Sequence, residues 1–157
     1  MMNGYGVIKM KYLKENVKIC NDNSGVKENS GRRFIASDIY VPEGYRIELF
    51  ASGLNAPISM VFTEEGDLLI AESGILTDDP RILRLSSSGY DIIASDFIAP
   101  IHGLCYRDRT MYVSQRGYIT SVKPDGTYVH LLSGLPSNGD YCNNQVTFGP
   151  DGKLYYG

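Results

Sequence analysis

From about residue 41 onward, the chain consists of short apolar runs separated by glycine, proline, aspartate and asparagine. The runs are four to six residues long, and several, such as 68–71, are apolar at successive positions. Strands packed on both faces have this pattern, whereas runs this short do not make amphipathic helices. We therefore predict β-strands joined by tight turns, at residues 59–62, 68–71, 81–85, 90–94, 118–122 and 128–132.

The strand pattern recurs along the chain with a period of 43 residues, the step that separates Phe62, Cys105 and Phe148. A period in the forties with about four short strands in each repeat is the sequence signature of a β-propeller blade. The expected fold class is therefore all-β, and the expected architecture is an incomplete β-propeller of about two and a half blades. The predicted blades span residues 41–94 and 95–132, with the first hairpin of a third at 133–157.

Residues 1–40 lack this pattern, and we expect them to form a basic, weakly structured segment. Their net charge is +3, against −6 for the rest of a chain whose total is −3. That acidic balance argues against a non-specific nucleic-acid partner. We find no apolar run long enough to span a bilayer and no secretory signal pattern, so no membrane partner is expected and the compartment stays open.

The three cysteines, Cys20, Cys105 and Cys142, predict neither a disulfide framework nor a zinc site. Their number is odd, and none of them forms a C-x-x-C pair. We interpret them as reduced thiols.

The loop at 135–145, which leads into the third repeat, is five residues longer than its counterpart before Gly103. Loops that enter the innermost strands of a propeller line its central channel, and loops carry function more often than strands do. This loop is a candidate ligand site, with a simple connection as the alternative. His102 lies at the matching entry of the second repeat, where an imidazole can act as a base near neutral pH or serve only a structural hydrogen bond. His130 lies in an outer-strand pattern, and we expect no role for it.

Three stretches of the chain, at 41–54, 66–72 and 134–155, resemble the glucose/sorbosone dehydrogenase family. Its members are six-bladed β-propellers related to the soluble quinoprotein glucose dehydrogenases. The resemblance covers roughly residues 41–157, and its most specific part is Gly134-Leu135-Pro136-Ser137, Gly139-Asp140 and Phe148-Gly149-Pro150-Asp151-Gly152-Lys153-Leu154-Tyr155. It implies oxidation of a sugar or alcohol hydroxyl, with pyrroloquinoline quinone (PQQ) as the hydride acceptor and calcium polarising the quinone.

The resemblance also implies an aspartate–histidine pair in the long loop as the general base. Asp140 stands at the family's aspartate, but Tyr141 stands where the histidine would be. A phenol has a reference pKa near 10, against about 6.5 for imidazole, and is a weak base at neutral pH. Either the pKa of Tyr141 is strongly lowered, or His102 takes over the role. Asn143 and Asn144 are the candidate cofactor-binding residues.

Two and a half blades do not close a propeller, so we expect this chain to be the N-terminal part of a longer protein or a truncated gene product. The alternative is that several copies of a partial propeller close the ring together. The family's calcium ligands and cofactor-clamping side chains would then lie beyond Gly157, and the chain by itself would be inactive as a dehydrogenase. Its expected partner is a small sugar or polyol, and its unclosed blades favour self-association.

Two other functions stay open for this sequence. One is a non-catalytic propeller that binds or scaffolds a partner. The other is a lactonase-type propeller hydrolase, for which Asn143 and Asn144 are the support.

Overall fold

The structure is a computed structural model that describes residues 5–12, 35–138 and 144–157, the first of these ranges by its backbone alone. In these ranges the regular structure is β-strand apart from one three-residue 3-10 turn, η1 (Ala36–Asp38). The sheets are antiparallel, which confirms the prediction of an all-β chain. The chain divides into two compact units, residues 1–55 and 56–157.

The first unit contains one antiparallel strand pair, β1 (Tyr5–Tyr12) and β2 (Tyr45–Leu54). Tyr12 lies opposite Tyr45, and Tyr5 lies opposite Leu54. β1 falls in the segment for which we expected little structure. A strand there depends on hydrogen bonds to a partner more than thirty positions away, which local alternation does not reveal.

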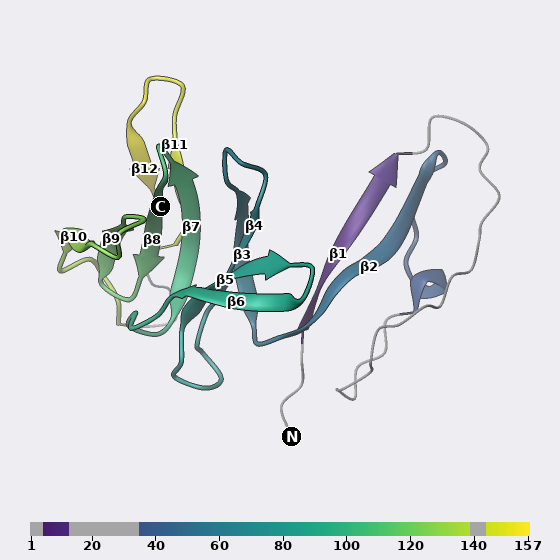
Figure 1. Ribbon diagram of the computed structural model, residues 1–157, viewed down its shortest axis with the longest axis horizontal. Helices are drawn as coiled ribbons and strands as arrows, with labels where there is room; N and C mark the ends of the chain where they lie inside the picture. The colour runs from purple at the N-terminus through teal and green to yellow at the C-terminus, as the bar shows by residue number, and fades with distance from the viewer. Residues whose placement is uncertain (1–4, 13–34, 139–143) are drawn as a thin grey trace. The chain divides into compact units, whose positions relative to one another are not determined.

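The second unit contains two four-stranded sheets and a hairpin (Figure 1). In both sheets each strand pairs with the next strand along the chain, and the short apolar runs form the predicted strands to within two residues. In the described ranges no sheet closes on itself, so the propeller stays a prediction. The first sheet comprises β3 (Pro57–Phe62), β4 (Leu68–Glu72), β5 (Arg81–Ser86) and β6 (Gly89–Ala94). The second comprises β7 (Ile101–Arg107), β8 (Thr110–Gln115), β9 (Tyr118–Val122) and β10 (Tyr128–Ser133), and the hairpin is β11 (Val146–Phe148) with β12 (Leu154–Tyr156).

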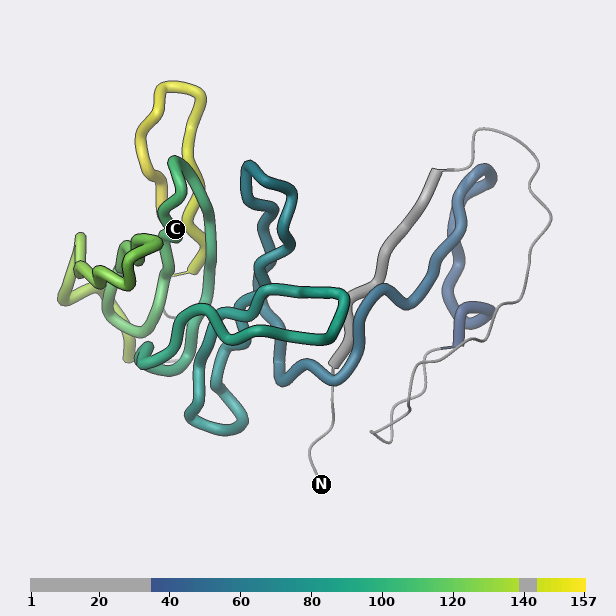
Figure 2. The backbone as a smooth tube through the Cα atoms, viewed as in Figure 1, coloured from purple at the N-terminus to yellow at the C-terminus, as the bar shows by residue number. Residues whose placement is uncertain are grey.

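The hydrophobic core lies between the first and the second sheet. Leu69, Ala71 and Ile82 come from the first sheet, and Leu104 and Val113 are among the residues that the second contributes. The first strands of the three repeats are neighbours, because β7 packs beside both β3 and β11 (Figure 2). β4 is buried at every position, which explains why it is apolar at successive positions rather than at alternate ones.

The second sheet departs from the period of 43 in its first hairpin. Phe62 pairs with Leu68, but in the second sheet Tyr106, not Cys105, holds the matching position opposite Met111. The cause is a two-residue turn at 108–109 with both φ angles positive, in place of the longer turn at 63–67. The sequence repeat therefore predicts the equivalent second strands correctly, and misplaces the first strand of this sheet by one residue.

Candidate functional site

Three loops of the second unit come together at one end of its sheets, which we call the loop end (Figure 1). They are the β4–β5 loop (73–80), the segment before β7 (95–100) and the β8–β9 turn (116–117). Backbone hydrogen bonds connect them, from Ile101 N–H to Ser73 C=O at 2.9 Å and from Arg116 N–H to Pro100 C=O at 3.2 Å. Leu135, at the start of the long loop, donates to the carbonyl of Gly117. The loop that the sequence singles out therefore begins at this end.

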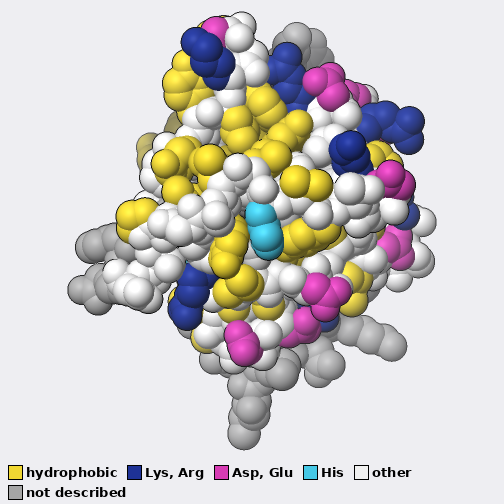
Figure 3. Space-filling view, turned by 90° about the vertical axis from the view of Figure 1, so that its left-hand side faces the viewer, with side chains coloured by type: hydrophobic (Ala, Val, Ile, Leu, Met, Phe, Trp, Pro, Cys, Tyr) yellow, Lys and Arg dark blue, Asp and Glu magenta, His cyan; other side chains and the backbone are white. Residues whose placement is uncertain are grey.

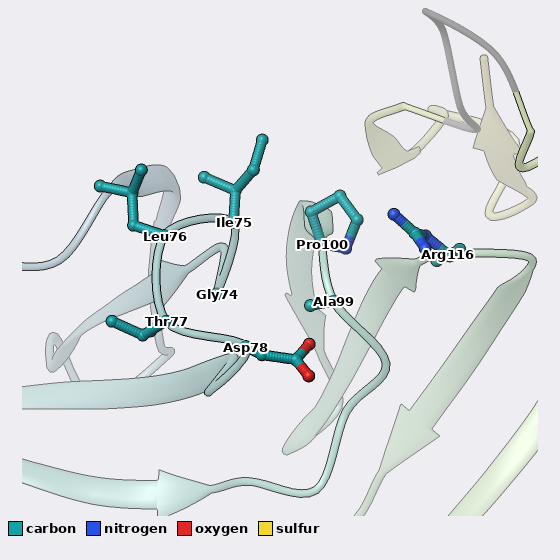
Figure 4. A pocket seen from close by; sticks show the side chains of 8 residues that line it. All are labelled: Gly74, Ile75, Leu76, Thr77, Asp78, Ala99, Pro100 and Arg116. Carbon is teal, nitrogen blue, oxygen red and sulfur yellow. The ribbon is translucent and has the colours of Figure 1, made fainter.

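A pocket of about 350 Å³ lies between these loops (Figure 4). Asp78 points its carboxylate from the β4–β5 loop toward the segment of Ala99 and Pro100, and Arg116 lies beyond Pro100. Thr77 adds a hydroxyl group. The pocket thus combines hydrogen-bond acceptors and donors, and its full lining is Gly74, Ile75, Leu76, Thr77, Asp78, Ala99, Pro100 and Arg116.

The backbone of the β4–β5 loop depends on a glycine. Gly74 has a φ of +73°, and a Cβ atom there would lie 2.6 Å from the backbone nitrogen of Pro80. An L side chain at this position would be strained and would also clash. Gly74 therefore fixes the shape of the wall that carries Asp78.

Two buried polar side chains, spaced by 43 residues, anchor the walls of the pocket. Glu72 ends β4 and accepts a 2.7 Å hydrogen bond from Nε of Arg81, across the base of the β4–β5 loop. Gln115 ends β8, and its Oε1 accepts the backbone N–H of Ile98 in the segment before β7. Charge-assisted and buried hydrogen bonds of this kind hold a loop more firmly than exposed ones do.

His102 lies on β7 at an irregularity of the strand, between Ile101 and Gly103. Its Nε2 atom is buried and has no hydrogen-bond partner among the residues that the structure describes. Burial lowers the pKa of His102 below 6.5, and the positive charge of Arg116 lowers it further. The lowered pKa favours the neutral imidazole at neutral pH, and its buried Nε2 lacks the partner that a buried polar atom normally has. Although His102 does not line the pocket, the influence of Arg116 on its pKa links it electrostatically to a residue that does.

A polar bridge joins the first strands of all three repeats. Gln145, next to β11, accepts the backbone N–H of Leu104 on Oε1 at 3.1 Å and donates from Nε2 to Ser59 Oγ at 3.2 Å. Gly103 permits this approach, because a Cβ there would lie 2.8 Å from Cα of Gln145. This bridge places the end of the long loop directly beside β7.

The site residues expected from the sequence are only partly accounted for. Asp140, Tyr141 and Asn143 lie outside the described residues. Asn144 is exposed, its backbone N–H donates to the carbonyl of Gly157, and it does not partner the buried Nε2 of His102. Across ranges 35–138 and 144–157, no group of three or more His, Cys, Asp and Glu side chains is arranged to hold a metal ion.

The sequence interpretation missed a network on the second sheet. Gln115 Nε2 donates to Tyr128 Oη at 2.9 Å and to Thr120 Oγ1 at 2.7 Å, and Thr120 Oγ1 lies 2.9 Å from Nδ1 of His130. His130, for which we expected no role, thus belongs to the group of side chains around Gln115. Alternation along β9 and β10 puts Thr120 and His130 on one face, and that was the signal available in the sequence.

Arg116 was also missed. Arg116 directly follows β8 and precedes a glycine with positive φ, a position typical of a turn residue. This position does not reveal that the charge of Arg116 lowers the pKa of His102.

A scan against protein-family models finds no match to this chain, and a search of curated proteins finds none. The resemblance to glucose/sorbosone dehydrogenases therefore stays a prediction. Among the residues that the structure describes, no helix is long and apolar enough to cross a membrane.

Proposed function

We propose that the second unit is part of a β-propeller whose loop end binds a sugar or polyol, in a protein of the glucose/sorbosone dehydrogenase kind. Two features support the propeller. The sheets are antiparallel meanders of four strands, and the first strands of successive repeats are neighbours. A ring of such sheets would surround an axis beside β3, β7 and β11, with the loop end as its mouth.

The observation that carries the function is the buried, unpartnered Nε2 of His102. Oxidation of an alcohol requires a group that accepts the hydroxyl proton while hydride leaves the carbon atom. A neutral imidazole is suited to this task. It carries no proton on one ring nitrogen at neutral pH, and it can take up a proton there to form the imidazolium ion. We assign His102 this role, in place of Tyr141, whose side chain is a much weaker base.

The pocket fits the rest of a polyol. The Asp78 carboxylate would accept hydrogen bonds from hydroxyl groups, and the Arg116 guanidinium would donate them. Exposed Ile75 and Leu76, on the same loop, offer apolar surface for the C–H groups of a sugar ring.

The family resemblance further proposes PQQ and calcium, but the described residues do not by themselves fit these groups. They offer no cluster of ligands for calcium. PQQ carries three carboxylates, whereas Arg116 is the sole cationic side chain that lines the described pocket. Both groups therefore stay expectations of the resemblance, and the role of His102 is derived without them.

The experiment observes both histidines of the chain by ¹⁵N NMR while sugars are added. With glucose or sorbitol, we expect the ring nitrogens of His102 to shift saturably and those of His130 to stay unchanged. Asp78→Asn and Arg116→Gln should each weaken this binding. Asp91→Asn and Arg84→Gln are the matched controls, since they make the same replacements in an ion pair that does not line the pocket and should leave binding intact.

The outcome separates the candidate functions. In the full-length gene product, sugar-dependent dye reduction that requires added PQQ and calcium, and is lost in His102→Asn, would support the dehydrogenase. Saturable sugar binding without dye reduction would favour the non-catalytic binding module. Lactone hydrolysis supported by a metal ion alone would favour the hydrolase. No shift of His102 with any sugar would contradict the proposal.

A further inference from the structure

The sheets of the second unit pack on one another in a single direction. We call face a of the second sheet the face that carries Leu104 and Val113, which lie opposite each other, and face b its reverse, which carries Tyr112. We define faces a and b of the first sheet and of the β11–β12 hairpin in the same way, from the alternation of side chains along each strand and from the cross-strand pairs. In the first sheet, Met60 lies on face a opposite Ile70, and Leu69 lies on face b.

Both contacts within the chain join a face b to a face a. The Leu69 side of the first sheet packs against the Leu104 side of the second. The Tyr112 side of the second sheet packs against face a of the β11–β12 hairpin, where the rings of Tyr112 and Phe148 lie 4.9 Å apart, edge to face. Arg107, also on face b, lies 4.9 Å above the Phe148 ring. The packing is therefore directional, and each repeat presents its face b to the next.

Along β3, no described residue of the second unit covers face a of the first sheet in this way. Met60 is 53% exposed, whereas the residues in the same register position, Leu104 and Val146, are 3% and 1% exposed. Phe62, two positions further on the same face, is 64% exposed. The exposure of Met60 therefore reflects a missing neighbour among the described residues, because the matching residues of the second and third repeats are covered by the repeat that precedes each of them.

In the part of the second unit that the structure describes, face b of the β11–β12 hairpin is exposed as well. Face b of the β11–β12 hairpin carries Thr147 opposite Tyr155. Thr147 is exposed, and Tyr155 is 51% exposed. One chain thus presents both halves of the contact that it makes twice internally.

We propose that, where no further blade of the same chain occupies it, the β3 side of face a of the first sheet is the docking surface for face b of the β11–β12 hairpin of a second copy of this chain. This inference rests on the blade-to-blade packing of the propeller proposed above. The arrangement continues the directional packing already present between the repeats, and it buries Met60 and Phe62 as Leu104 is buried within the chain. Because the two surfaces differ, the contact is head to tail, and copies either close into a ring or extend as a series.

A second apolar surface serves as a control. Hydrophobic side chains also gather on the side of the molecule that Figure 3 shows. The strand β10, which lies toward that side in Figure 1, exposes Val129, Leu131 and Leu132. Leu131 lies at the register shift of β10, the position that Ile93 holds on β6, and Ile93 is exposed even though a further sheet follows its own. Leu131→Glu should therefore leave association unchanged.

The test is sedimentation velocity of the full 157-residue chain at increasing concentration. We expect the unaltered chain to associate. Met60→Glu, which damages face a, and Thr147→Glu, which damages face b, should each raise the dissociation constant by ~10-fold or more, because a charge would be buried without a partner. Circular dichroism would verify that each variant keeps its strands.

Mixing the two variants distinguishes this contact from any symmetric one. The Thr147→Glu copy retains an intact face a, and the Met60→Glu copy retains an intact face b, so the mixture should form dimers that neither variant forms alone. A monomeric unaltered chain would overturn the proposal. So would undiminished self-association of either variant, or a mixture that stays monomeric.

Discussion

Gly103 provides the most direct test of how the three repeats are held together. It lies on β7, where Gln145 passes close to the backbone. In Gly103→Ala, the new methyl group would lie 2.8 Å from Cα of Gln145 and 3.0 Å from the backbone nitrogen of Val146, and it would overlap Oε1 of Gln145. Backbone atoms on both sides leave little room for relief.

The expected cost follows from two terms. Overpacking of a close-packed site costs about 1–3 kcal/mol. Displacement of Gln145 would also weaken its hydrogen bonds to Leu104 and Ser59, each contributing about 1 kcal/mol. We therefore expect the free energy of unfolding to fall by about 3 kcal/mol.

Urea unfolding, followed by far-ultraviolet circular dichroism at low protein concentration, measures this change. The same glycine substitution made in a Gln145→Ala background should cost less, because the side-chain overlap is gone while the backbone contacts stay. A Gly103→Ala protein within about 0.5 kcal/mol of the unaltered chain would refute the close approach of β11 to β7.

Three other predictions concern charge and protonation. Arg81→Ala removes the guanidinium from Glu72, which is 1% exposed, and should lower the free energy of unfolding by about 3 kcal/mol, measured by urea unfolding; a loss below about 0.5 kcal/mol would contradict a structural role for the pair. Burial raises the pKa of the Cys105 thiol to about 11, so at pH 8 the folded chain, with its other cysteines replaced by serine, should be alkylated far more slowly than in urea; equal rates would refute this burial. The pKa of His102 lies below 6.5, so NMR titration should place its midpoint there, and Arg116→Gln should raise the midpoint only in part because burial is the larger cause. Since the folded state disfavours the proton on His102, this residue should make stability decline as the pH falls below 6.5; a midpoint at or above that value would contradict the buried Nε2.

The local pattern of apolar and turn-forming residues was sufficient to predict the strands of the second unit. Runs such as 68–71 and 118–122 are bounded by turn residues, so both type and limits follow from residues close in sequence. It was insufficient for β1, whose partner lies far along the chain, and for the register of Tyr106, which depends on the turn type at 108–109. Turn type is set by a balance of small backbone preferences that a repeat comparison does not resolve.

The candidate site was predicted in part. His102 was identified by its place at the entry of a first strand, and the structure adds that its Nε2 is buried and that Arg116 lowers its pKa. Gln145 was read as one polar residue of a long loop, yet it bridges two strands from other repeats. Side chains such as that of Gln145 contact strands of other repeats only because the sheets pack together, so the sequence near them does not show these contacts.

The sequence by itself determined the all-β class, the repeat and, to within two residues, the limits of the predicted strands of the second unit, because each depends on alternation, turn residues and spacing along one stretch of chain. Tertiary structure alone decided which face of each sheet is covered, which loops meet at the loop end, and the protonation preference of His102. These properties arise from burial and from charges brought together by distant segments, so the residues that create them are not neighbours in the sequence.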